Sequence, residues 1–270
     1  MVGRYTLEEE LARGPFGRVY RAVDAEQGFR VALKIFAMEP GASEADRSAW
    51  AARILGEARA AAQVRLEHAV AVHEVGLTAA GHPYLVRDYI VGDSLAVHAR
   101  DSRPETLPAK SRWLRDYARL LAQLHDAGVL HRSVSPDNAV VRRDGALRVL
   151  GFGIAHRSVD RAAGVSPPSS RFLDRAPPSS PFARMAGYLA PEQLGHRPVG
   201  PSADQFAWGV MAYEVLSGEP PWGHHDKAVR LVEAVLTREP PPLAAYRPWV
   251  PPAFDALLRR CLAKSEDQRF

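Results

Sequence analysis

The sequence predicts an α+β fold with a small, strand-rich N-terminal lobe and a larger, mostly helical C-terminal lobe. Three observations support this prediction. Apolar and polar residues alternate with a period of two over residues 4–36, which is typical of half-buried strands. Two later segments, 111–128 and 202–218, repeat apolar residues at helical spacing instead. The change of character follows VGDSL (91–95).

The N-terminal lobe is expected to be an antiparallel sheet with one helix. Turn residues separate the first three apolar stretches, and two further stretches rich in β-branched and aromatic residues follow. Between them lies an alanine-rich segment, 45–66, with apolar residues repeating near 3.6, which predicts a helix. The expected strands are 4–11, 18–23, 29–36, 69–76 and 82–90.

Capping signals bound the helices of the C-terminal lobe. Gly128 ends the first helix, whereas Ser202 and Gly218 are expected to cap the start and end of the second. Between these helices, Asp144-Gly145 predicts a turn joining two short strands. Residues 156–187 are rich in Pro, Ser and Arg and lack periodicity, so they are either functional or disordered.

Composition excludes several classes of protein. The chain of 270 residues is 46% hydrophobic and 24% charged, which is enough for an ordinary buried core. Its one cysteine, Cys261, excludes an internal disulfide or a four-cysteine metal site and favours the cytoplasm. No run of 18 apolar residues predicts a membrane span. The densest basic run, 110–119, has helical spacing and predicts a solvated face, so we expect no nucleic-acid partner.

A set of motifs then follows in a specific order. Gly14 and Gly17 lie between the first two strands, which alone predicts no more than a β-turn. VALK with Lys34 comes on the next strand, and Glu57 lies in the middle of the following helix. The segments HRS....N, GFG, APE and SADQFAWG complete the order.

Over residues 4–270 the sequence resembles the bacterial branch of the Ser/Thr protein kinase family. The resemblance implies one bilobal domain over the whole chain, 1–270. Its parts would be an N-lobe 1–87, a hinge 88–92, a C-lobe 93–270 and, within the C-lobe, an activation-segment-like loop 151–192.

By this resemblance, several residues would form a nucleotide site. Gly14 and Gly17 would let the backbone approach the phosphates, and Lys34 would contact the α and β phosphates while held by Glu57. The remaining positions would surround adenine, although the apolar ones would also be core residues in any fold. They are the hinge residues Asp88 and Ile90, with Val19, Ala32 and Val140 around the ring.

Two further matches would hold the fold together. Asp204 would accept backbone N–H bonds from the loop near His131 and Arg132, while Glu192 of APE would form a buried ion pair with Arg269. The histidines of the chain show no metal-binding spacing, and we expect them to be structural or exposed.

The positions of the chemistry differ from the family pattern. An active member has one aspartate that accepts the proton of the substrate hydroxyl and another that holds magnesium. Ser133 and Gly151 stand at these positions, and neither offers an anionic oxygen. The lysine and threonine that would bond the first aspartate are replaced by Ser135 and Met185.

Nucleotide binding is also expected to be weakened. Pro15 has no backbone N–H to offer a phosphate, and Arg87 replaces an apolar residue before the hinge. We expect Arg87 to bond Glu57 in competition with Lys34, or else to neutralise phosphate in place of magnesium; the alternative is that it bends away to solvent. Asn138 is the residual metal ligand, and one neutral amide is a poor magnesium site.

These observations predict a pseudokinase. We expect no required cofactor, weak ATP binding at most and no magnesium-dependent binding. The expected partner is another protein, such as an active kinase or its substrate. The alternatives are a weakly active or non-standard kinase, in which Asp137 or Glu57 supplies a carboxylate, and a nucleotide or small-molecule sensor. Because SEDQRF ends where another helix would ordinarily follow, we also expect the natural protein to continue beyond Phe270.

Overall fold

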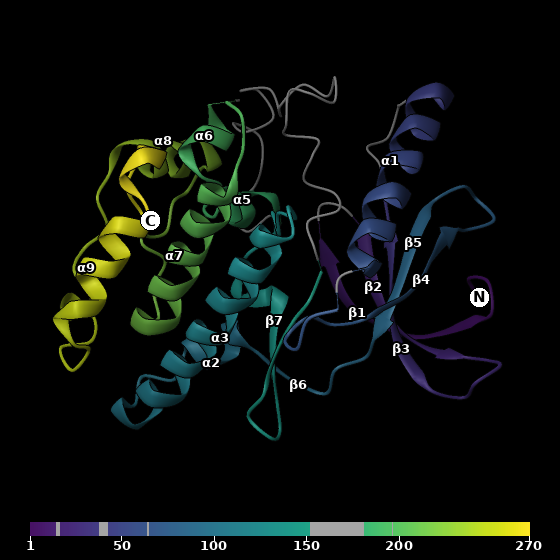
Figure 1. The fold of residues 1–270 in the computed structure, drawn as a ribbon, viewed down its shortest axis with the longest axis horizontal. Helices are drawn as coiled ribbons and strands as arrows, with labels where there is room; N and C mark the ends of the chain where they lie inside the picture. Colours follow the sequence, from purple (N-terminus) through teal and green to yellow (C-terminus); the bar gives the residue numbers. More distant parts are fainter. Residues whose placement is uncertain (15–16, 38–42, 64, 152–180, 196) are drawn as a thin grey trace. The chain divides into compact units, whose positions relative to one another are not determined.

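Five antiparallel strands and one long helix form the first unit, Met1–Val91, of the computed structural model (Figure 1). Its strands lie in the order β1-β2-β3-β5-β4. Their bounds are β1 Tyr5–Gly14, β2 Gly17–Asp24, β3 Arg30–Phe36, β4 Val72–Leu77 and β5 Pro83–Asp88. The structure describes residues 1–14, 17–37, 43–63, 65–151, 181–195 and 197–270.

The two faces of this sheet differ because side chains alternate along each strand. One face carries a buried apolar cluster that includes Tyr5, Ala22, Leu33 and Val86. Glu74 of β4 is paired in register with Val86 and accepts a hydrogen bond from the Tyr5 hydroxyl at 2.8 Å. The strands predicted from the alternation over residues 4–36 are therefore confirmed.

The helix described in this unit, α1 (Glu44–Gln63), packs against β4 and β5. Ile54 and Ala58, one turn apart, are both almost fully buried. This helix confirms the prediction made from residues 45–66.

The second unit, Gly92–Phe270, combines a three-stranded sheet with most of the helices (Figure 1). The sheet has the order β6-β7-β8, and the turn at Asp144-Gly145 joins β7 to β8 as predicted. Its strands are β6 Gly92–Ser94, β7 Ala139–Arg142 and β8 Leu147–Val149. The helices are α2 Leu95–Ala99, α3 Leu107–Asp126, α5 Pro181–Ala186, α6 Pro191–Leu194, α7 Pro201–Ser217, α8 Ala228–Thr237 and α9 Pro252–Cys261.

Helix α7 lies at the centre of this unit, where it contacts α2, α3 and α9. Most of its side chains are buried, as expected for a helix that is hydrophobic all round. Gly218 ends it with φ of 83°, a left-handed conformation that favours glycine. The α+β fold predicted from the sequence is thus confirmed.

The prediction that Ser202 caps α7 was wrong. Gly200 is the N-cap residue and Pro201 is the first helical residue. Proline suits this position because a backbone N–H in the first turn would have no acceptor within the helix, and proline has no N–H. The hydroxyl of Ser202 donates instead to Glu266 at 3.3 Å.

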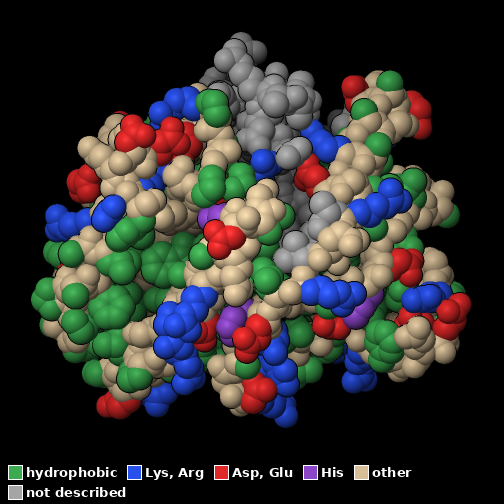
Figure 2. Space-filling view, viewed as in Figure 1, with side chains coloured by type: hydrophobic (Ala, Val, Ile, Leu, Met, Phe, Trp, Pro, Cys, Tyr) green, Lys and Arg blue, Asp and Glu red, His purple; other side chains and the backbone are tan. Residues whose placement is uncertain are grey.

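Charged side chains of both signs are interspersed over the face shown in Figure 2, and no single basic patch dominates it. None of the helices among the described residues combines the length and the apolar character needed to cross a lipid bilayer.

Candidate functional site

The loop between α3 and β7 is anchored by a carboxylate from the central helix. Asp204 of α7 is 2% exposed and accepts backbone N–H bonds from His131 at 2.7 Å and from Arg132 at 2.6 Å. His125, at the end of α3, contributes a third bond at 2.9 Å between its Nε2 and the same carboxylate. Burial would raise the pKa of Asp204, but the bonds from His125 and the backbone lower it overall. The predicted anchoring role of Asp204 is confirmed.

Arg132 has a strained backbone that this anchor supports. Its φ is 60°, the only positive value at a non-glycine residue among those described. A left-handed residue other than glycine costs on the order of 1–3 kcal/mol and persists only where its surroundings fix it. The bond from the Arg132 N–H to Asp204 fixes it here.

His131 is a structural residue of this loop. It is fully buried, and its ring packs edge-on against Tyr117 with centroids 5.7 Å apart. Burial lowers the pKa of His131 to about 4, and the opposing effect of the Asp204 charge only partly offsets this. The imidazole is therefore neutral at physiological pH.

We expect this buried histidine to make the fold acid-sensitive. The unfolded chain takes up a proton below the ordinary histidine pKa of 6.5, whereas the folded chain does so only near 4. Stability should therefore fall as pH decreases through this window, by at most about 1.4 kcal/mol per pH unit. Urea unfolding at several pH values measures this dependence, which His131→Phe should reduce and exposed His82→Gln should not. Coincident profiles for the wild type and His131→Phe would contradict the assignment.

Ser133, which the resemblance places at the position of the catalytic aspartate, contacts Asn138. The side-chain amide of Asn138 donates to the Ser133 carbonyl at 2.8 Å and to its hydroxyl at 2.9 Å. Asn138 is the last residue of the 3₁₀ turn Pro136–Asn138, which follows Ser133 in the same loop. A serine hydroxyl in this position is a weak base, because its ordinary state at neutral pH carries no negative charge.

The residues present do not fit a divalent metal site. Magnesium prefers carboxylate oxygens, and this region supplies the neutral amide of Asn138 and a glycine at 151. Asp137 is exposed, and its charge acts on Tyr188 and Glu214. Within the described ranges, no group of three His, Cys, Asp or Glu side chains could hold an ion.

The remaining predicted positions of the C-lobe lie in separate places. Ser135 has an extended backbone before the 3₁₀ turn, Val140 lies on β7, and Met185 is half-buried in α5. Gly151, with φ of 63°, is the last described residue before 181. Most of the predicted loop 151–192, namely residues 152–180, lies outside the described residues.

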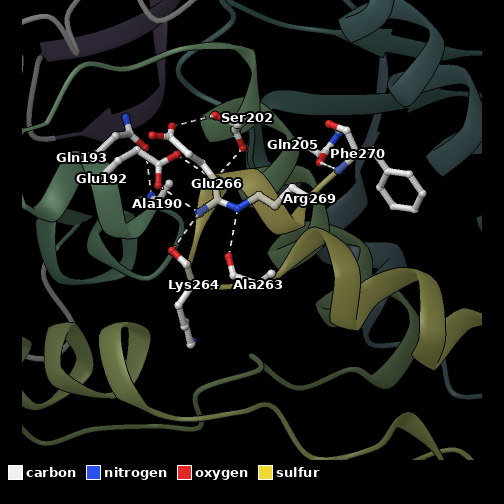
Figure 3. Close-up of polar contacts among 10 residues, drawn as sticks. All are labelled: Ala190, Glu192, Gln193, Ser202, Gln205, Ala263, Lys264, Glu266, Arg269 and Phe270. Atoms are coloured by element: carbon white, nitrogen blue, oxygen red, sulfur yellow. Dashed lines mark hydrogen bonds and ion pairs between the residues drawn. The ribbon is translucent and has the colours of Figure 1, made fainter.

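The ion pair between Glu192 and Arg269 is fully buried (Figure 3). Two bonds of 2.7 and 2.9 Å join the carboxylate to the guanidinium in a bidentate arrangement. Arg269 also donates to the carbonyls of Ser202 and Ala263, both at 2.9 Å, so its donors are well satisfied. The predicted pair is confirmed, and it ties α6 to the C-terminal segment.

Lys34 and Arg87 of the N-lobe do not make the contacts that we expected. Among the described residues, no ion pair joins either side chain to Glu57, which has another interaction, and the guanidinium of Arg87 makes no hydrogen bond. The ammonium of Lys34 instead lies 4.7 Å from the ring centroid of Phe36. The prediction that Arg87 bonds Glu57 is therefore wrong for the described part of the chain, whereas its alternative, that Arg87 neutralises phosphate, stays a prediction.

The other N-lobe positions lie on or beside the sheet. Gly14 and Gly17 are paired where β1 and β2 meet, and Pro15 is outside the described residues. A Cβ on Gly17 would lie 2.0 Å from the Ile35 carbonyl, so only glycine fits there. Val19 lies on β2 and Ala32 on β3.

Asp88 ends β5, and both its backbone and side chain have partners. Its N–H donates to the Ala71 carbonyl at 3.2 Å, and its carboxylate contacts His73 Nε2 at 2.6 Å. Ile90 follows two residues later and is half-buried.

Sequence reasoning missed two groups near these positions. His125 was expected to be structural or exposed, and its bond to Asp204 could have been suspected only from its place at a helix end before the loop. Tyr188 donates a hydrogen bond to Glu214, and burial raises the pKa of both groups. No pattern in the sequence indicated the Tyr188–Glu214 pair, since the two residues lie 26 positions apart.

Comparison with known proteins agrees with this fold. A family model described as the protein kinase domain matches residues 5–270. The crystal structure of the Mycobacterium tuberculosis PknI kinase domain superposes with a TM-score of 0.69 at 25% identity, covering 100% of this chain and 91% of that one. The chain therefore belongs to the protein kinase family.

Curated relatives place it beside bacterial Ser/Thr kinases. It is 30% identical to the serine/threonine-protein kinase PknH of Mycobacterium bovis over 270 residues, which are 100% of this chain and 42% of PknH. It is also 30% identical to the serine/threonine-protein kinase PknL of Mycobacterium tuberculosis over 267 residues, 99% of this chain and 62% of PknL. The chain thus spans about two-fifths to three-fifths of these relatives.

Proposed function

We propose that this member of the protein kinase family is a pseudokinase, which acts by binding and does not transfer phosphate. One observation carries the proposal. The residues that hold the fold, Asp204 and the Glu192–Arg269 pair, are present and make their bonds, whereas Ser133 and Gly151 replace the two carboxylates that phosphate transfer needs.

The experiment that tests this proposal measures ATP turnover by the purified protein with magnesium and with manganese. We expect no transfer to the chain or to a generic substrate above the level of Lys34→Ala, the matched variant. Turnover that is abolished by Lys34→Ala would refute the proposal, since it would show that this site performs the chemistry.

We further propose that the functional partner is another protein, such as an active kinase or the substrate of one. The retained fold supports this proposal, because a protein-binding surface needs the fold but does not need the two catalytic carboxylates. The relatives are much longer than this chain, so the activity and partners of the whole protein also remain proposals. The free thiol of Cys261 is buried, which is compatible with our proposed cytoplasmic location.

A weakly active kinase is the second candidate. Lys34 and Asn138 support it, because both are residues that an active member uses. A nucleotide sensor is the third candidate, and the neighbouring cations Lys34 and Arg87 of the N-lobe favour it.

A further inference from the structure

Two cations stand beside each other on one face of the N-lobe sheet. In the pairing of β3 with β5, Ala32 lies opposite Arg87 and Lys34 lies opposite Leu85. Because side chains alternate along strands, Lys34 and Arg87 project from the same face as diagonal neighbours. Diagonal positions are about 7–8 Å apart, within reach of long side chains.

No carboxylate neutralises either cation within the described part of the chain. The two acidic residues of β4 and β5 have other partners. Asp88 contacts His73, and Glu74 accepts hydrogen bonds from Tyr5 and Tyr84 on the opposite, core-facing side of the sheet.

The surroundings make this arrangement unfavourable without a counter-ion. Burial lowers the pKa of Lys34 to about 8, and the like charge of Arg87 adds to that effect. Burial likewise lowers the pKa of Arg87 to about 10. Two half-buried like charges are costly to hold close together, and a bound anion would remove that cost.

We propose that Lys34 and Arg87 form a phosphate site that binds a nucleoside di- or triphosphate without a divalent metal. Arg87 supplies the positive charge that a metal ion would otherwise bring to the phosphates. Its planar guanidinium suits this task because it can donate two parallel hydrogen bonds to one phosphate. This inference deepens the proposed binding function and rests on the same family assignment.

The test is calorimetric titration of the whole chain with ATP and with pyrophosphate, each in EDTA and in excess magnesium. We expect ATP to bind in EDTA at least as tightly as with magnesium. Arg87→Met should weaken metal-free binding by about tenfold or more, as expected for losing a hydrogen bond to a charged group. Arg87→Lys, which keeps the charge but not the fork, should be intermediate.

Arg30→Met is the matched control for Arg87→Met, because Arg30 lies on β3, the strand that carries Lys34, but its side chain is 64% exposed. It should bind ATP within about twofold of the wild type. The Tm of each free variant shows whether it folds, and we expect that of Arg87→Met to be unchanged or higher, since the substitution removes a half-buried charge that lacks a counter-ion.

The outcomes separate this inference from the proposed function. Tighter binding of ATP than of pyrophosphate assigns the site to a nucleotide, whereas equal binding assigns it to inorganic phosphates; both outcomes support the anion site. Binding that requires magnesium, or that Arg87→Met leaves unchanged, overturns the inference but leaves the pseudokinase proposal standing. Magnesium-dependent binding accompanied by turnover would overturn both.

Discussion

Glu192→Ala is expected to destabilise the C-lobe by about 3–5 kcal/mol, the usual cost of breaking a buried ion pair by removing one partner. Both side chains of the pair are 0% exposed, so the substitution would leave the Arg269 guanidinium charged in a site without solvent. Its bonds to the carbonyls of Ser202 and Ala263 provide no compensating negative charge. This loss is a large fraction of the 5–15 kcal/mol by which domains are normally stable.

Urea unfolding followed by tryptophan fluorescence measures this effect. Trp222 is buried in the same apolar cluster as Phe206, on which the Arg269 guanidinium lies, and should report on it. The matched control is Arg230→Ala, which removes an exposed ion pair with Asp226 and should cost about 0.3–0.5 kcal/mol. Equal effects of Glu192→Ala and Arg230→Ala would show that the buried pair does not hold the fold.

Phosphate transfer by the wild-type chain is expected to be at least about 10,000-fold slower than by a family member with both carboxylates. A positioned general base contributes typically about 100- to 10,000-fold, and a charge-stabilising group often a comparable factor. At position 133 the structure places a neutral hydroxyl bonded to the Asn138 amide, and at 151 a glycine. Neither can accept a proton efficiently or grip a hard cation.

Introducing carboxylates at positions 133 and 151 also tests the expected inactivity, because it should increase phosphate transfer. The double variant Ser133→Asp with Gly151→Asp should transfer more phosphate than the matched double variant with asparagine at both positions, which has nearly the same shape without charge. Aspartate and asparagine are among the residues that tolerate the positive φ of Gly151. Transfer by the wild type at a rate comparable to the double aspartate variant would contradict the expected inactivity.

The fold and its anchors could be predicted because they depend on patterns along the chain. Alternation over 4–36 and helical spacing over 111–128 and 202–218 fixed the elements, and the order of motifs identified Asp204 and the Glu192–Arg269 pair. The fold determines where the residues of each anchor lie. Recognising these residues in the sequence was therefore sufficient to predict their contacts.

The contacts of Lys34 and Arg87 could not be predicted in the same way. An ion pair with Glu57 needs a helix and a strand to bring two side-chain ends within 4 Å, and residue identity does not determine that distance. Similarly, Ser202 has the right chemistry for an N-cap, yet Gly200 and Pro201 set where α7 begins. For Lys34, Arg87 and Ser202, the sequence indicated which groups are present, and the structure showed which of them make contact.

The central claim is that the site holds no divalent metal for phosphate transfer. Its most direct test is the structure of a crystal grown with ATP and manganese, with the anomalous signal of the metal recorded. We predict no ordered manganese ion coordinated by Asn138 or by any other side chain of the C-lobe. An octahedral manganese ion held by Asn138 and a substitute oxygen, with the terminal phosphate in line with a substrate hydroxyl, would contradict the account.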